Sequence, residues 1–200
     1  MHLVLFDIDG TLVESYDFDF ECYRSAIFEV LGVEIETDWG QYQHVKDTGI
    51  LNEIIEDRPL QDEYESIFKE VKKQFTLRIK KYILNHEVLL ISRASTFLSY
   101  LAQRYDVIIA LATGGWSETA KLKLNAAGIN HSAIPIASSC DHACARRHLH
   151  ESLKSLSEFS ETPERLRDVF VAYYKMANIE EYGGWWSKTY KQLLYIQSKV

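Results

Sequence analysis

Short apolar runs alternate with longer helical patterns along the chain. Leu3 to Phe6 and Val107 to Ala112 are continuous apolar runs, each followed at once by a polar turn that contains glycine. Runs of this length predict strands that are buried on both faces, as in a parallel sheet. Ala133 to Ala137 is a third candidate strand, and Val169 to Tyr173 is a weaker fourth. We therefore expect helices to alternate with buried strands.

The segment between the first two strands has a helical period. Its stretches FDFECYRSAIFEVLG and ILNEIIEDRPLQDEYESIFKEVKKQFTLRIKKYIL repeat apolar residues at helical spacing. We expect an inserted bundle of helices over residues 17–90, while residues 1–16 and 91–200 form the sheet domain. Alternation of buried strands with helices implies a doubly wound α/β sheet, whose ligands bind outside the carboxyl ends of the strands.

Two further helices are expected in the sheet domain. One covers Ala94 to Gln103, and the other follows the turn after the second strand. Ser117 or Thr119 is the expected cap of this later helix, and Gly128 is expected to end it.

Composition narrows the class of protein. The 200 residues are 46% hydrophobic and 26% charged, and no apolar run is long enough to cross a bilayer. The formal charge of −7 argues against general binding to nucleic acid, which depends on clustered basic residues. Asp7 interrupts the first apolar segment, unlike a secretory signal, and an odd count of three cysteines suits a reducing compartment. We expect a cytoplasmic protein.

Two aspartates directly follow the first predicted strand. Asp7 and Asp9 lie where that strand ends, so both carboxylates can turn toward the crevice. Paired carboxylates repel each other unless a cation is near, and Mg²⁺ prefers one or two carboxylates together with phosphate oxygens. The pair therefore predicts a metal and a phosphate. Gly10 allows close approach of the backbone, and the amides near Ile8 and Gly114 are candidates to hold phosphoryl oxygens.

The longer motif resembles a known family. An apolar strand that ends in DIDGT, at residues 7–11, resembles the first motif of the haloacid dehalogenase-like (HAD) hydrolase superfamily. The stretch IIALATGG resembles the second motif, with Thr113 at the phosphate-binding place. The resemblance implies a Rossmann-like core, and it implies that the helical insertion is a cap that closes over the site and selects the substrate.

The resemblance also implies a mechanism. Asp7 would be the nucleophile and Asp9 the general acid and base, with both as ligands of Mg²⁺. The implied phosphate-binding residues are Thr113, Gly114, Ile8 and Thr11. Phosphatases of the family carry the second aspartate and dehalogenating members do not, so the expected reaction is hydrolysis of a small phosphorylated metabolite.

A third motif of the family supplies a cation. Arg146 is the first candidate for this catalytic role because it follows the third predicted strand, and Arg147 is the next. Lys121 and Lys123 are alternatives, but KLKLNAAG is typical of an amphipathic helix, and we interpret both lysines as part of its solvated face.

The fourth motif of the family is an apolar strand that ends in acidic residues. In VFVAYYKMANIEEYGGWWSKTYKQ two tyrosines and a lysine occupy that place. Asp168 precedes the segment, and Glu180 and Glu181 come late. Either a late glutamate reaches the metal, or the chain is a catalytically weakened member that binds phosphate ligands or a partner, or the C-terminal part diverged by a change of reading frame. The aromatic residues of this region either pack on the sheet edge or form a homodimer contact.

Residues of the insertion are expected to recognise the substrate. Tyr42, His44 and Lys46 are the candidates that the sequence offers. Asp47 and Thr48 follow in HVKDTGI, and they fit either a position at the face between cap and core or the N-cap of a helix.

Overall fold

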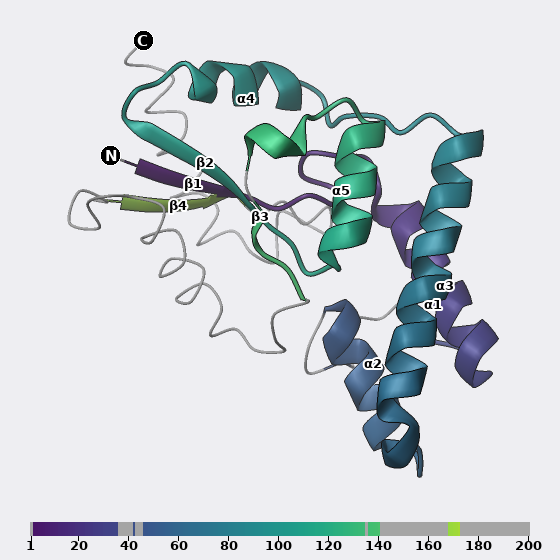
Figure 1. Cartoon of the computed structure of the whole chain (residues 1–200). Helices are drawn as coiled ribbons and strands as arrows, with labels where there is room; N and C mark the ends of the chain where they lie inside the picture. The colour runs from purple at the N-terminus through teal and green to yellow at the C-terminus, as the bar shows by residue number, and fades with distance from the viewer. Residues whose placement is uncertain (1, 36–41, 43–45, 135, 141–167, 173–200) are drawn as a thin grey trace, which may run out of the picture.

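Four parallel strands form the sheet of this computed structural model, which describes residues 2–35, 42, 46–134, 136–140 and 168–172. The strands are β1 (His2–Phe6), β2 (Val107–Ala112), β3 (Ile136–Ser138) and β4 (Asp168–Ala172), in the order β3-β2-β1-β4 (Figure 1). The chain passes outward from β1 to β2 and β3, and β4 then pairs with the other side of β1. The order reverses at β1, so the crevice at the carboxyl end of β1 is where such a sheet binds ligands.

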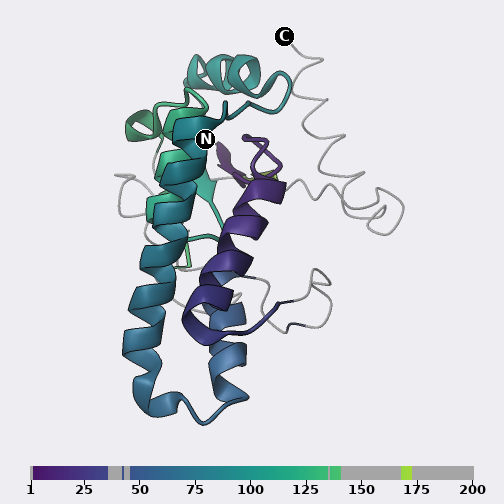
Figure 2. The same cartoon turned by 90° about the vertical axis from the view of Figure 1, so that its right-hand side faces the viewer.

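Five helices lie between these strands in the described residues. They are α1 (Tyr16–Leu31), α2 (Asp47–Glu56), α3 (Tyr64–Asn85), α4 (Ala94–Ala102) and α5 (Ser117–Ala126), with short 3₁₀ turns at η2 (Gln61–Glu63) and η3 (His131–Ala133). The first three helices all fall between β1 and β2, and α1 and α3 run side by side (Figure 2). None of the described helices is long and apolar enough to span a membrane.

Three of the four strand predictions hold to within one residue. The second strand has the predicted bounds, the first begins one residue earlier, and the fourth is displaced by one residue. The third strand is wrong in its first half, because residues 131–133 form the turn η3, in which the side chain of Asn130 accepts a hydrogen bond from the amide of Ser132. This local bond gives the backbone an alternative to the sheet.

The predicted cap of α5 is also wrong. Trp116 occupies the N-cap position, without a side-chain capping bond, and Ser117 is already the first helical residue. The Thr119 hydroxyl donates to the Trp116 carbonyl oxygen at 2.9 Å. Gly128 does follow the end of the helix, with a φ of +82° that favours glycine.

Aromatic side chains join the helical segment to the start of α5. Trp116 is fully buried, with its ring 5.9 Å from Tyr23 of α1 and 5.8 Å from Phe75 of α3 between centroids. Phe68 of α3 meets the same ring edge-on at 5.6 Å. Such pairs contribute roughly 0.5–1.5 kcal/mol each beyond the area they bury. This cluster fixes α1 and α3 against the turn that follows β2.

Candidate active site

A tight turn holds the two aspartates directly after β1. The carbonyl oxygen of Ile8 accepts hydrogen bonds from the amides of Thr11, Leu12 and Val13, at 3.2, 2.9 and 3.0 Å. Gly10 has a φ of +74°, in the left-handed region that glycine adopts without strain. The DIDGT sequence therefore folds into a compact turn at the reversal point of the sheet, and Asp7 and Asp9 are both partly exposed there.

The carboxyl group of Asp7 is held in an environment that disfavours its charge. Burial, and after it the charge of Asp9, raise the pKa of Asp7 to about 7, although the Ile8 amide and the Thr11 hydroxyl lower it. The Thr11 hydroxyl donates to Asp7 Oδ2 at 3.3 Å. A nearby cation would relieve this repulsion and favour the ionised form of Asp7.

The donor set fits a hard cation. Mg²⁺ binds through one or two carboxylates, keeps several waters and takes further oxygens from substrate phosphate. Asp7 supplies such a carboxylate, and Asp9 is placed to supply a further oxygen. Among the described residues no group of three or more His, Cys, Asp and Glu side chains is placed to hold a metal ion. Within the described residues, Asp7 and Asp9 are the pair whose chemistry fits Mg²⁺.

Asp9 accepts two short hydrogen bonds on one oxygen. The Ser15 hydroxyl donates to Asp9 Oδ1 at 2.5 Å, and Lys123 Nζ donates to the same oxygen at 2.5 Å. Ser15 is the fully buried residue before α1, and Lys123 lies on α5. The second aspartate is therefore fixed by groups from two helices that are more than 100 residues apart in sequence.

Lys123 is a buried cation, which corrects its interpretation as part of a solvated helix face. It is 1% exposed, and its ammonium also contacts Asp19 Oδ1 of α1 at 2.5 Å. Burial alone would lower the pKa of Lys123, but the charges of Asp19 and Asp9 outweigh it and hold the pKa above its ordinary value. Burial raises the pKa of Asp19 to about 6, although Lys123 opposes this. Lys121, by contrast, is exposed as expected.

The sequence does contain an indication that Lys123 is buried. The buried positions of α5 are Thr119, Ala120, Lys123 and Leu124, which are spaced three and four residues apart. A lysine on this stripe faces the protein interior rather than the solvent. No comparable sequence pattern indicates the role of Asp19, because its partner Lys123 is 104 residues away in the chain.

The turn after β2 lies beside the turn after β1. Phe6 pairs with Leu111 in the parallel register, so Asp7 and Thr113 leave the sheet at the same edge. The Thr113 hydroxyl is buried and accepts a hydrogen bond from the Gly115 amide at 3.0 Å. The carbonyl oxygen of Gly114 accepts from the Asp47 amide at 3.2 Å. The TGG turn is thereby held between the sheet and the start of α2.

Asp47 lies at the start of α2 and against that turn. Its Oδ2 accepts a hydrogen bond from the Trp116 amide at 3.1 Å, and the Tyr23 hydroxyl donates to its carbonyl oxygen. Burial raises the pKa of Asp47 well above its ordinary range, and the charge of Asp19 adds to this. Thr48 accepts from Trp116 Nε1 at 3.0 Å and donates to the Cys140 carbonyl at 3.1 Å. The N-cap alternative for this pair is wrong, because Lys46 occupies the N-cap position and Asp47 is already the first helical residue. Both side chains instead contact residues beyond the helix, at Trp116 and Cys140.

Several sequence predictions lie outside the described residues. They are the third-motif candidates Arg146 and Arg147, the substrate-recognition candidate His44, the late glutamates Glu180 and Glu181, and the aromatic region behind the homodimer prediction. Asp168 is described by its backbone and pairs with His2, at the opposite end of β1 from Asp7. Its position in the sheet therefore places Asp168 at the wrong edge to complete a metal site.

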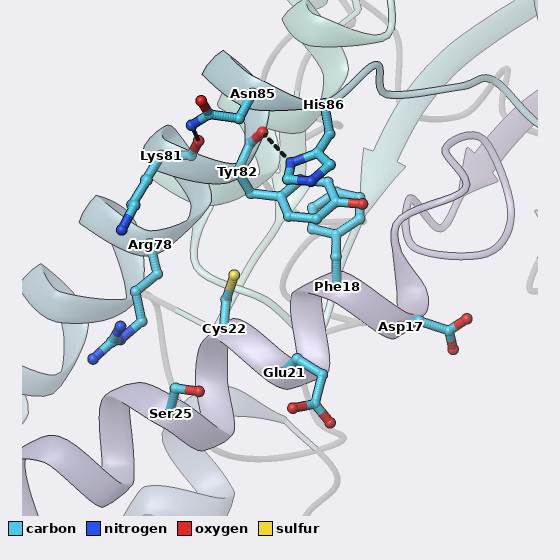
Figure 3. A pocket seen from close by; sticks show the side chains of 10 residues that line it. All are labelled: Asp17, Phe18, Glu21, Cys22, Ser25, Arg78, Lys81, Tyr82, Asn85 and His86. Carbon is cyan, nitrogen blue, oxygen red and sulfur yellow. Dashed lines mark hydrogen bonds between the residues drawn. The ribbon is translucent and has the colours of Figure 1, made fainter.

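A groove with charged side chains along it lies between α1 and α3. Figure 3 shows this groove, with Asp17 and Glu21 on α1 and Arg78 and Lys81 on α3. Its volume is about 660 Å³, and the rings of Phe18, Tyr82 and His86 stack at one end. Neither Asp7 nor Asp9 lines it.

The arrangement defines a class of protein: an α/β enzyme fold with paired carboxylates and a glycine turn at the carboxyl ends of its central strands. The family model described as haloacid dehalogenase-like hydrolase matches residues 1–165, so the chain belongs to the haloacid dehalogenase-like hydrolases. The resemblance drawn from the DIDGT and TGG motifs is confirmed.

Solved structures show the same fold. CbbY from Rhodobacter sphaeroides, in complex with phosphate, is 17% identical with a TM-score of 0.59, and the match covers 88% of each chain. A predicted phosphoglycolate phosphatase from Haemophilus somnus is 21% identical with a TM-score of 0.58, over 84% of this chain and 75% of that one. A hydrolase from Pseudomonas syringae is 16% identical with a TM-score of 0.61, over 78% and 71%. No curated protein matches the chain.

Proposed function

We propose that the chain is a Mg²⁺-dependent phosphomonoester hydrolase that acts on a small phosphorylated metabolite through a phosphoenzyme on Asp7. The observation that carries this proposal is the pair of aspartates in the tight turn after the central strand, beside the buried hydroxyl of Thr113. Family membership and the structural likeness to a phosphate-bound relative support it. The odd number of cysteines favours a cytoplasmic location.

In the first step Asp7 is the nucleophile. One oxygen of its carboxylate attacks phosphorus, the bond from phosphorus to the ester oxygen breaks, and Asp9 gives a proton to the departing alkoxide. The hydroxyl of Thr113 and the amides of Gly114 and Ile8 hold the phosphoryl oxygens, and Thr11, which already donates to Asp7, flanks them. Bound Mg²⁺, held by Asp7 and Asp9, would offset the negative charge of phosphate and carboxylates.

In the second step Asp9 acts as a base. It takes a proton from water, which attacks the phosphorus of the aspartyl phosphate and releases inorganic phosphate with Asp7 restored. Asp9 then carries the proton that the next cycle needs. Atoms and charges balance over the cycle, because one ester and one water yield one alcohol and one phosphate.

The helical segment acts as the cap of this site in our proposal. Residues 17–90 form a unit that covers the crevice of a doubly wound core, made of residues 1–16 and 91–200. The contacts of Asp47 with the TGG turn support this arrangement, since they join the start of α2 to the phosphate-binding residues. Tyr42 and Lys46, close to Asp47 in sequence, remain the candidates for substrate recognition.

The rival proposal is a weakened member of the family that binds phosphate ligands or a partner. The observation that favours it is the end of β4: Ala172 pairs with Phe6, and the sequence continues with two tyrosines and a lysine rather than with an acidic residue. Such a chain would bind inorganic phosphate but would not hydrolyse a phosphate ester.

Release of phosphate from p-nitrophenyl phosphate, with and without Mg²⁺, separates the two proposals. The hydrolase proposal predicts turnover that requires Mg²⁺ and is lost in Asp7→Asn, with the fold of the variant confirmed by circular dichroism. A native chain that binds phosphate in calorimetry without any turnover would contradict the hydrolase proposal and favour the rival.

A further inference from the structure

We propose that Lys123 is a positioning residue, which together with Asp19 fixes the carboxylate of Asp9 for proton transfer to the leaving group. This inference rests on the proposed function, since it assigns a task to the acid and base of that reaction. It concerns the second aspartate and not the nucleophile. Lys123 contacts Asp9 directly, with its ammonium 2.5 Å from Asp9 Oδ1.

The geometry around Asp9 leaves its carboxylate one orientation. Ser15 and Lys123 both donate to Oδ1, each at 2.5 Å, from the start of α1 and from α5. Two donors on one oxygen fix the plane of the carboxylate. Oδ2 is then the oxygen left for exchange of a proton with the substrate. General acid catalysis requires the acid within hydrogen-bond reach of the leaving oxygen, and small displacements reduce its rate.

Asp19 holds the ammonium in turn. A lysine ammonium has three donors and a flexible stem, so a single carboxylate partner does not define its position. Here the ammonium lies between Asp9 and Asp19, at 2.5 Å from an oxygen of each, and the lysine is 1% exposed. Because Asp19 belongs to α1, the orientation of Asp9 depends on how α1 sits against α5. The link thus joins the chemical step to the first helix of the inserted segment.

The leaving group supplies the test. p-Nitrophenolate departs with little need of a proton, whereas the alkoxide from an alkyl phosphate such as glycerol 3-phosphate needs one. We expect Lys123→Met to lower kcat/KM roughly 100-fold on the alkyl ester, as for loss of a general acid, and only a few-fold on the aryl ester. The constant kcat/KM is the proper readout, because it ends with departure of the alcohol and excludes hydrolysis of the phosphoenzyme. Lys121→Met, on the exposed side of the same helix, is the matched control and should change neither value.

Asp19→Asn should act in the same direction with a smaller loss, roughly 10-fold on the alkyl ester. The single variant Lys123→Met leaves the carboxylates of Asp9 and Asp19 without their shared cation, and the double variant with Asp19→Asn removes one of these two charges. The double variant should also lose more activity on the alkyl ester than on the aryl ester. Asp19→Asn retains the lysine and decides the question if both Lys123 variants fail to fold.

Two outcomes would overturn the inference. Equal losses on both esters in the folded variants would show that Lys123 and Asp19 only support the structure, and the proposed function would stand. A native chain without turnover on either ester would overturn the proposed function and this role with it.

Discussion

The crevice at the end of β1 and the groove between α1 and α3 both combine acidic and basic side chains, yet they differ in how those charges are held. In the crevice Lys123 is buried and contacts Asp9 and Asp19 at 2.5 Å. In the groove Arg78 pairs with Glu29 of α1, and their side chains are 33% and 49% exposed. The groove is the open cavity of about 660 Å³, but the perturbed carboxyl groups lie in the crevice.

This difference indicates which of the two regions is the catalytic site. Shifted pKa values at the carboxyl ends of strands reflect buried charges that must be balanced, and such imbalance is common at catalytic sites. Exposed ion pairs contribute little and are screened by salt. In this protein the size of a cavity therefore indicates the position of the active site less well than the burial of its charged side chains does.

The largest contrast is expected in turnover. Asp7→Asn removes the nucleophile and should lower kcat on an aryl phosphate at least about 1,000-fold. His86→Ala, in the groove, should leave kcat unchanged because its ring stacks on Tyr82 away from the aspartates. Steady-state kinetics of both variants measures this, and a comparable loss in His86→Ala would move the active site to the groove.

Stability should show the next contrast. Lys123→Met leaves two carboxylates without their cation and should lower the free energy of unfolding by roughly 3 kcal/mol. Lys121→Met, which is exposed on the same helix, should change it by less than about 0.5 kcal/mol. Urea denaturation followed by circular dichroism compares the two, and equal midpoints would contradict the buried position of Lys123.

The pH dependence of stability isolates Asp7. Its pKa is about 7 in the folded chain against an ordinary 3.8, so between these values the folded state binds more protons than the unfolded state. The free energy of unfolding should therefore fall as the pH rises from about 4 to about 7. Asp7→Asn removes this loss and should stabilise the chain by about 1–2 kcal/mol at pH 7.5 without Mg²⁺. The free energy of unfolding of the native chain and of the variant would be measured against pH in EDTA. Parallel curves for the two would contradict the raised pKa of Asp7.

The smallest effect is expected in the groove. Arg78→Gln removes an exposed ion pair and should cost roughly 0.5 kcal/mol, and less in high salt. Urea denaturation in low and high salt measures it. A loss as large as that of Lys123→Met would mean that the charges of the groove are as tightly coupled as those of the crevice.

Much of the fold follows from local patterns in the sequence. The run VIIALA predicts β2 to the residue, because a buried parallel strand is a continuous apolar run bounded by a glycine turn. The third strand was predicted too early, because the local bond between Asn130 and Ser132 cannot be read from apolar periodicity. The DIDGT and TGG motifs indicate the family from the sequence alone.

The interior of the site was harder to predict. Lys123 looked like a surface residue because lysine in an amphipathic helix is usually solvated, and only its position on the buried stripe of α5 points inward. The pairing with Asp19 depends on how α1 packs against α5, which no local pattern encodes. Long-range ion pairs of this kind follow from the tertiary arrangement and not from sequence spacing.

Detection of the phosphoenzyme tests the central claim most directly. The native chain would be quenched with borohydride during turnover of p-nitrophenyl phosphate, which converts an aspartyl phosphate to homoserine, and the peptide that contains residue 7 would be read by mass spectrometry. We predict homoserine at Asp7 only when both substrate and Mg²⁺ are present. Turnover with Asp7 unmodified, or with the modification at another residue, would contradict the account.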